Sequence, residues 1–291
     1  MSPPSLPPIS RRRRRTDKLM RGLLALGTGI ALIPLILIVY YLLHKGLSSW
    51  TSGGFFTTDP NGNFFGNPGG IRSAIFGSLE IVGLASAIAI PIGIGVALYL
   101  TEYGKDTRYA SVIRYFVDVM TGVPSIMFGL FIYIVLVISK AGGVGFTAWK
   151  GAIAISLLML PIVIRSAEVV LLLVPSGLRE AALALGAPRW QVIRRVVLPT
   201  ALPGLVTGSL LAVARGMGET APLLFTVSVA FGLTGNLNAQ MNTLPLQIFG
   251  DITSPRTAVT DRAWGAALTL VTLVLILNVV ARAIARRSRM A

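Results

Sequence analysis

The sequence predicts an all-α fold, a polytopic membrane bundle of about six transmembrane helices. The 291 residues are 54% hydrophobic and 13% charged, which is more apolar surface than one soluble core buries. The apolar residues form runs long enough to span a bilayer of ~30 Å. The net charge of +15 comes from basic residues at the chain ends and in short loops between these runs. We therefore expect membrane lipid as the solvent and no nucleic-acid partner.

The first apolar run covers residues 19–44 and follows a basic tail at residues 1–18, which contains the arginines from Arg11 to Arg15. A basic leader before an apolar segment is also typical of a signal peptide. This run is longer than the ~7–15 residues of a signal core and has no small-residue cleavage site. We predict that it is a retained first transmembrane helix.

Further candidate spans follow, each long enough at ~1.5 Å per residue to cross the hydrocarbon. They cover residues 73–101, 112–138, 147–174, 199–230 and 263–284. Pro91, Pro161 and Pro222 lie within three of them and are expected mainly to shape helix packing. Most lysines and arginines fall on one side if both termini are cytoplasmic, as the positive-inside rule requires. We therefore predict a multi-pass protein of the bacterial cytoplasmic (inner) membrane with both termini inside.

The segments outside these spans carry no evident catalytic machinery. Residues 48–70 and 231–261 are expected to be irregular outer loops that are too short to be a substrate-capturing domain, so we expect capture by a partner. The absence of cysteine excludes a disulfide framework, a thiolate metal site and a cysteine nucleophile. Neither a nucleophile with a base nor a metal-ligand cluster is evident in the sequence. We predict that the chain is not an enzyme and binds no cofactor itself.

One cytoplasmic segment, residues 176–199, combines charge with apolar surface. Ser176 can cap a short helix that Gly186 ends, and Pro188 can start a second helix. Arginines keep the segment in water, whereas its apolar side chains exceed what a short solvated loop needs. Those side chains belong to Ala181, Ala182, Leu185, Trp190, Ile193 and Val197. We predict that another protein docks here.

This segment resembles the cytoplasmic loop of the binding-protein-dependent ABC importer permeases, which carries Glu-Ala-Ala, three residues, Gly, nine residues, Ile, one residue and Leu-Pro. The matching residues are Glu180, Ala181, Ala182, Gly186, Val196, Leu198 and Pro199. The only departure is Val196 in place of Ile. The resemblance implies a MetI-like transmembrane domain at residues 71–284, whose loop is a coupling helix that inserts into a cleft of an ATPase subunit. The sequence has no Gly-x-x-x-x-Gly-Lys-Ser/Thr motif, so we expect ATP and Mg to be used by that separate subunit.

Other stretches are similar to the phosphate-importer permeases of the PstA type. They are Tyr99-LTEYG, Gly122-VPSIMFGLFIY, Ala214-RGMGETAPLLF and Met241-NTLPLQIF. The sequence from Glu219 to Pro222 favours this type over its PstC-type partner. The resemblance implies phosphate import by a complex with a homologous PstC-type permease, two PstB-type ATPase subunits and an extracytoplasmic PstS-type phosphate-binding protein.

Charged residues within the spans are candidates for the substrate pathway, because a charge at bilayer depth is costly and usually faces an interior or a water-filled path. Arg215 lies about 16 residues, or ~24 Å of helix, beyond Pro199, and its guanidinium offers a planar fork of donors to a tetrahedral oxyanion. Glu219 shares its helix face and can accept a hydroxyl that phosphate carries and sulfate lacks. Gly216 and Gly218 permit close approach of a neighbouring helix or a local break. A structural ion pair between Arg215 and Glu219 is the alternative to direct contact with the anion.

The remaining pathway candidates have weaker support. Thr220 follows Glu219 in the family-like stretch. Arg165 pairs at helical spacing with Glu168 near the cytoplasmic interface, where a structural role is favoured. Glu80 lies in the outer half of the second span and has no evident partner.

Two other functions are compatible with the sequence. One is a permease for a different oxyanion, such as sulfate or molybdate. The other is an ion-coupled secondary transporter, which can also use an intramembrane arginine and glutamate but does not need the coupling loop.

Overall fold

The computed structural model describes residues 10–287 apart from 62–65, 106, 141–142, 144 and 231. Within these residues the chain is helical, and its only β pairing is an isolated antiparallel bridge between Pro60 and Gly69. The α-helices are α1 (Arg11–Trp50), α2 (Arg72–Leu98), α3 (Arg108–Gly122), α4 (Ser125–Ile132), α5 (Ala148–Leu172), α6 (Ser176–Ala184), α7 (Arg189–Val192), α8 (Leu198–Met217), α9 (Ala221–Leu224), α10 (Leu244–Ile252) and α11 (Thr257–Arg287). The π-helical segments η1 (Tyr99–Tyr103), η2 (Tyr133–Ile138) and η3 (Ile193–Val197) extend or join them. The predicted all-α class is confirmed.

Among the described residues, five helical segments are long and apolar enough to cross a membrane. They are Arg12–Trp50, Arg72–Tyr103, Ala148–Leu172, Arg189–Met217 and Thr257–Val280. A sixth candidate is the segment Arg108–Gly122 with Ser125–Ile138, which is bent by 103°. The prediction of about six spans is confirmed, but the continuous helix predicted at residues 112–138 is wrong. Pro124 breaks it, because proline offers no N–H and favours an extended conformation at the preceding residue, here Val123 with φ −73° and ψ 129°.

The helix predicted at residues 199–230 also ends early. Helix α8 stops at Met217, and the short α9 follows with Pro222 in its first turn. The residues between α8 and α9 interrupt the helix, and this is the local break that Gly216 and Gly218 were predicted to permit. A Cβ atom at Gly129 of α4 would lie only 2.6 Å from the Cα atom of Pro222, so α4 and α9 are in close contact beyond the break.

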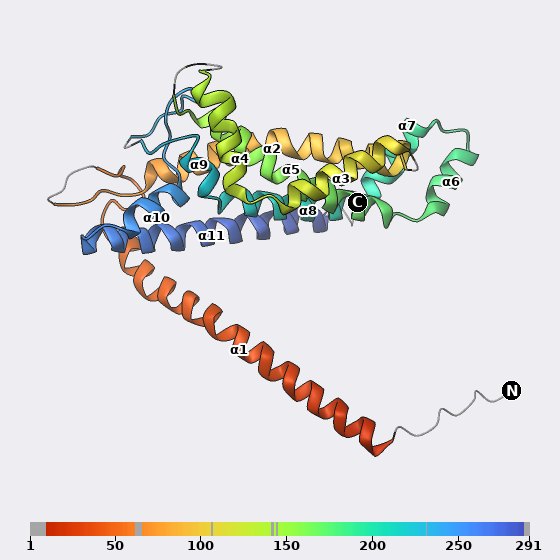
Figure 1. The fold of residues 1–291 in the computed structure, drawn as a ribbon, viewed down its shortest axis with the longest axis horizontal. Coiled ribbons are helices and arrows are strands. Elements are labelled where there is room, and N and C mark those ends of the chain that lie inside the picture. Colours follow the sequence, from red (N-terminus) through yellow and green to blue (C-terminus); the bar gives the residue numbers. More distant parts are fainter. Residues whose placement is uncertain are drawn as a thin grey trace.

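Helix α5 is the centre of the bundle, with α2 and α8 packed along it (Figure 1). The contact is made by Ile81, Ala85 and Ala89 of α2, Ala152, Ile155 and Met159 of α5, and Ala212 of α8. Small side chains allow close backbone approach, which matters where lipid removes the hydrophobic drive for helix association. Pro91 and Pro161 lie inside α2 and α5, and both helices continue through them.

Helix α1 diverges from the bundle over most of its length (Figure 1). In the described part of the chain, 0% of its apolar window is buried, against 56% for α5. Its last turns pack on α11, where a Cβ atom at Gly46 would lie 2.8 Å from the Cβ atom of Leu268. The predicted first span is therefore part of a longer helix that begins within the predicted basic tail. Residues 1–9 of that tail lie outside the described residues.

The two ends of the bundle carry different elements (Figure 1). Helices α6 and α7 form one end, and α10 lies with the long loops at the other. The start of α1 and the end of α11 both lie toward the α6 end. The predicted irregular loop at residues 231–261 is wrong in part, because α10 and the first turns of α11 lie within it. Arg262 of α11 contacts Asp251 of α10 with N···O distances of 2.7 and 2.8 Å, and this buried pair holds the helical part in place.

Candidate functional site: the coupling segment and an arginine-lined cavity

The segment at residues 176–199 forms two short helices joined by a tight turn. Gly186 adopts φ +82° directly after α6, a conformation that glycine accepts without strain, so its predicted role as helix terminator is confirmed. Pro188 precedes α7 as predicted. The predicted cap at Ser176 is wrong, because Pro175 is the N-cap residue and Ser176 is the first residue of α6. Helix α7 continues through η3 into α8 and so connects the segment to the bundle.

The coupling segment presents apolar surface to its surroundings. Leu185 is 88% exposed and Trp190 is 54% exposed. Glu180 and Ala181 are exposed, whereas Ala182 is half-buried. Helix α6 lies entirely within the described residues, and none of its residues is buried. This surface fits the predicted docking of another protein.

Two residues predicted to contribute to that surface do not. Ile193 is 9% exposed and Val197 is 0% exposed, because η3 packs against the ends of the spanning helices rather than pointing outward. Val197 belongs to an apolar cluster with Leu171 of α5 and Ala97 of α2. The large exposed apolar side chains of the segment therefore lie on α6, its turn and Trp190.

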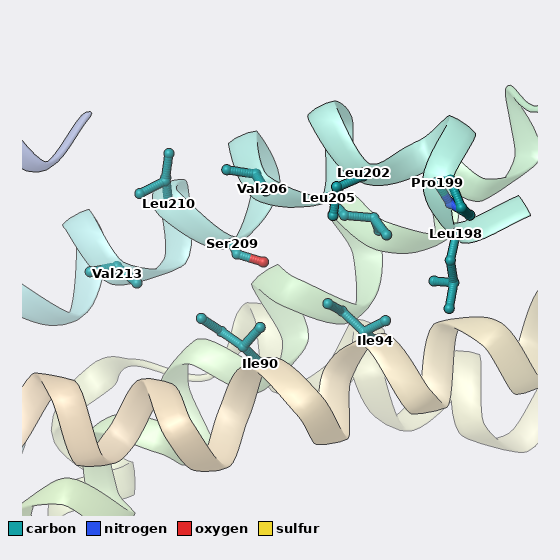
Figure 2. Close-up of a pocket in the computed structure, with 10 residues that line it drawn as sticks. All are labelled: Ile90, Ile94, Leu198, Pro199, Leu202, Leu205, Val206, Ser209, Leu210 and Val213. Carbon is teal, nitrogen blue, oxygen red and sulfur yellow. The ribbon is translucent and has the colours of Figure 1, made fainter. Parts of the chain in front are cut away.

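An apolar groove of about 590 Å³ starts at Leu198 and Pro199 and runs between α8 and α2 (Figure 2). Ile90 and Ile94 form its α2 side. Ser209 carries the only polar side chain among the described residues that line it. A groove of this composition suits lipid or an apolar helix and offers an anion almost no donors.

A second cavity, of about 430 Å³, contains the arginine that the sequence singled out. Arg215 of α8 lines it together with Thr121 of α3 and Ser125, the first residue of α4. Leu158 and Pro161 of α5 complete this part of the wall. The break between α3 and α4 therefore brings a hydroxyl and a helix N-terminus to the same cavity as a guanidinium, and all three favour an anion.

Arg215 and Glu219 form an ion pair with an N···O distance of 2.8 Å. The Arg215 side chain is 59% exposed and that of Glu219 is 11% exposed. Glu219 can approach because it lies just beyond the end of α8. Thr220 comes next, is half-buried, and its carbonyl accepts the N–H groups of Leu223 and Leu224 at 3.1 Å. The pair thus leaves the arginine accessible and encloses the carboxylate.

Arg165 lies in a charged network between α3 and α5, about one helical turn from the cavity wall. Its predicted pair with Glu168 is confirmed by an Nη1···Oε2 distance of 2.8 Å. It also donates to Asp118, and Glu168 accepts from Arg114 Nε at 2.7 Å. These contacts between helices favour the structural interpretation of Arg165. Arg114 and Asp118 were not predicted to belong to this network. Their i, i+4 spacing places them on one face of α3 and is the signal that could have indicated a charged face there.

Glu80 is half-buried on α2 and does not line the cavity of Arg215. Its Oε2 atom is buried and has no hydrogen-bond partner among the described residues. The structure thus pairs Arg215 with Glu219 and places Thr220 next to the pair only along the chain, whereas Arg165 and Glu80 lie apart from the cavity.

A bundle of spanning helices with an exposed helical loop at one end and an accessible arginine in a cavity fits the class of membrane permeases. The family described as "Binding-protein-dependent transport system inner membrane component" matches residues 89–290. Among solved structures, the chain is similar to the inward-facing MetNI methionine ABC transporter, with a TM-score of 0.59, 22% identity and coverage of 74% of this chain and 94% of that chain. It is also similar to a bacterial ABC transporter that imports the acidic polysaccharide alginate, with a TM-score of 0.59, 16% identity and coverage of 95% and 98%. At these identities the likeness shows the fold alone.

Curated relatives are more similar in sequence. They include the phosphate transport system permease protein PstA of Haemophilus influenzae, 41% identical over 93% of this chain and 94% of the relative. PstA 1 of Mycobacterium tuberculosis (strain CDC 1551 / Oshkosh) is 38% identical over 97% of this chain and 93% of the relative, and PstA of Yersinia pestis is 39% identical over 94% and 93%. The chain therefore belongs to the binding-protein-dependent permeases of ABC importers, multi-pass proteins of the inner membrane, and among them to the PstA family.

Proposed function

We propose that this chain is the transmembrane permease subunit of an ATP-driven importer that moves inorganic phosphate across the cytoplasmic membrane. The substrate is assigned because the chain is 38% to 41% identical, over nearly its full length, to proteins named phosphate transport system permeases. The exposed guanidinium of Arg215 agrees with an anionic solute. No observation favours the two alternatives, a permease for another oxyanion or an ion-coupled secondary transporter.

In the proposed pathway, Arg215 attracts the anion and Glu219 selects it. Hydrogenphosphate approaches the accessible guanidinium from the cavity, where the hydroxyl of Ser125 is also available. The hydroxyl of the phosphate donates to the Glu219 carboxylate, whereas unprotonated sulfate meets only repulsion there. The alternative, a structural pair without contact to the solute, predicts no effect of Glu219 on selectivity.

Energy input is proposed to come from a separate ATPase that docks on the coupling segment. Glu180, Ala181 and the turn at Gly186 supply the exposed contact surface. Leu198 and Pro199 connect it to α8. ATP and Mg belong to that partner, and this chain binds no cofactor itself.

The proposed complex contains this chain, a homologous PstC-type permease, two PstB-type ATPase subunits and an extracytoplasmic PstS-type phosphate-binding protein. The start of α1, the end of α11 and the coupling segment lie toward the same side along the long axis of Figure 1, although α1 starts far from the bundle, and this supports placing both termini in the cytoplasm. The first helix is proposed to be retained, and residues 71–284 to form the permease domain.

The test is phosphate uptake by the complex reconstituted in vesicles. We expect uptake that requires ATP and the loaded binding protein, that persists when ionophores collapse ion gradients, and that excess sulfate or molybdate inhibits weakly. Uptake driven by an ion gradient without ATP would identify a secondary transporter. Preferential uptake of sulfate or molybdate would identify another oxyanion importer.

A further inference from the structure

Arg179 lies beside Glu180 in the coupling segment but faces the bundle instead of the solvent. Its side chain is 21% exposed, whereas Glu180 is exposed. Among the residues of α6, all of which are described, only Arg179 and Ala182 are half-buried and the rest are exposed. These two residues lie three positions apart and so share one face of the helix. Arg179 and Ala182 therefore form the face of α6 that is turned toward the bundle, and α6 also contacts α7 and η3.

The guanidinium of Arg179 connects α6 to two spanning helices. Its Nε and Nη2 atoms donate to Oε1 of Glu102 at 3.1 and 2.9 Å. Nη2 also donates to the carbonyl of Leu171 at 2.9 Å, and Nη1 donates to the carbonyl of Val174 at 2.6 Å. Glu102 belongs to η1, which continues α2, and Leu171 lies in the last turn of α5. One side chain thus holds the inner ends of α2 and α5 together with α6.

These contacts suit an arginine and protect the pair from water. The last carbonyls of a helix lack partners within the helix and attract a cation. The Glu102 side chain is 12% exposed, so its charge is less screened than that of a surface pair. A lysine carries a single nitrogen and cannot reproduce a planar fork that reaches a carboxylate and two carbonyls.

We propose that Arg179 is a positioning residue that transmits movement of the docked ATPase from α6 to α2 and α5. The inference rests on the proposed function, since it requires an ATPase on the coupling segment. Besides Arg179 and Ala182, α6 contacts α7 and η3 and is joined to the bundle by the chain at residues 173–175 and 185–188, which is not helical. Without the guanidinium, α6 loses its ion pair to η1 and its hydrogen bond to α5, so it can move with the ATPase while α2 and α5 stay in place. Glu102 lies in the stretch Tyr99-LTEYG, which is similar to the phosphate-importer permeases. The proposed substrate pathway uses no residue of this stretch.

The test compares energy coupling in the reconstituted complex with Arg179→Gln, Arg179→Lys and Glu102→Gln. The matched control is Arg108→Gln, which changes an exposed arginine at the start of α3, outside the coupling segment. Two quantities are measured: phosphate moved per ATP hydrolysed, and stimulation of the ATPase by the loaded binding protein. We expect Arg179→Gln to reduce both about tenfold while basal ATP hydrolysis and copurification of the ATPase stay unchanged.

The other variants sharpen the result. Arg179→Lys and Glu102→Gln should give intermediate losses, and Arg108→Gln none. Exchange of the charges, Arg179→Glu with Glu102→Arg, should restore part of the coupling, because the ion pair returns without the bonds to the α5 carbonyls. A wild-type ratio in Arg179→Gln would overturn the proposal. So would loss of the ATPase from the complex in all three variants, since Arg179 would then only shape the docking surface.

A failure of the proposed function is visible separately. If the wild-type complex moves no phosphate with ATP, the substrate assignment is wrong. Stimulation of the ATPase by the binding protein loaded with the solute that the complex does move then decides the role of Arg179.

Discussion

Two arginine–glutamate pairs of this protein share one chemistry and differ in their surroundings. Arg179 and Glu102 are 21% and 12% exposed and lie 2.9 Å apart, and they belong to helices far apart in the sequence. Arg215 and Glu219 lie 2.8 Å apart, but Arg215 is 59% exposed and the two residues are one helical turn apart. An enclosed arginine that also binds backbone carbonyls fastens elements together. An arginine that remains accessible in a cavity has donors that a solute can reach.

The largest effect is expected from removing the docking surface on α6, the helix that the Arg179–Glu102 pair joins to the bundle. Deletion of Glu180 to Gly186 should reduce both copurification of the ATPase and ATP-dependent phosphate uptake to background, because the exposed part of α6 and its turn are lost. The measurement is uptake in vesicles together with the amount of permease in the membrane. Persistent uptake that follows an ion gradient would contradict the coupling role of the segment.

The second largest effect is expected at Arg215, the accessible arginine. Arg215→Lys should lower phosphate uptake about tenfold, equivalent to about 1.4 kcal/mol, because a point charge replaces a fork of donors. Copurification of the ATPase should stay unchanged, which distinguishes this variant from the deletion. Arg108→Lys is the matched control on the protein surface. Near-normal uptake by Arg215→Lys would remove Arg215 from the pathway.

The partner carboxylate is expected to affect selectivity more than rate. Glu219→Gln should change the inhibition of phosphate uptake by sulfate several-fold, equivalent to about 1 kcal/mol, because a neutral amide no longer repels the unprotonated anion. The measurement is the sulfate concentration that halves phosphate uptake in the variant and in the wild type. Unchanged inhibition would support the structural interpretation of the pair.

The smallest effect is expected at a third pair, in the loop before α2. Asp59 accepts from Arg72 at 2.6 Å and from the backbone of Ser73 at 3.1 Å. The hydrogen bond from Arg72 lowers the pKa of the Asp59 carboxyl, so the pair stabilises the fold above the unfolded pKa of about 4 and this contribution is lost as pH falls through the folded pKa. Asp59→Asn should therefore lower the thermal unfolding midpoint slightly near neutral pH, with a difference that shrinks in acid. A difference that is independent of pH would mean that the charge of Asp59 contributes nothing.

The spanning helices were predictable because length and apolar composition suffice to identify them. The coupling segment was predictable because its glycine, prolines and exposed apolar residues occur within a short stretch of sequence. The break at Pro124 was not predicted, because a proline inside an apolar run can either bend a helix or end it. Pro91 and Pro161 lie within continuous helices, whereas Pro124 separates two helices by 103°. Neighbouring helices decide between these outcomes, because they determine whether the freed backbone groups find partners.

The sequence by itself determined the class of fold, the position of the coupling segment and the presence of charges within the spans, because these depend on composition and on residues close along the chain. It also placed Glu219 one turn from Arg215. Only the tertiary structure decided which charges are enclosed and which are accessible. Arg179 meets Glu102 across 77 positions and Arg114 meets Glu168 across 54, and such contacts depend on how the helices pack. The same packing leaves Arg215 open to a cavity, because α3 and α4 diverge at Pro124 beside it.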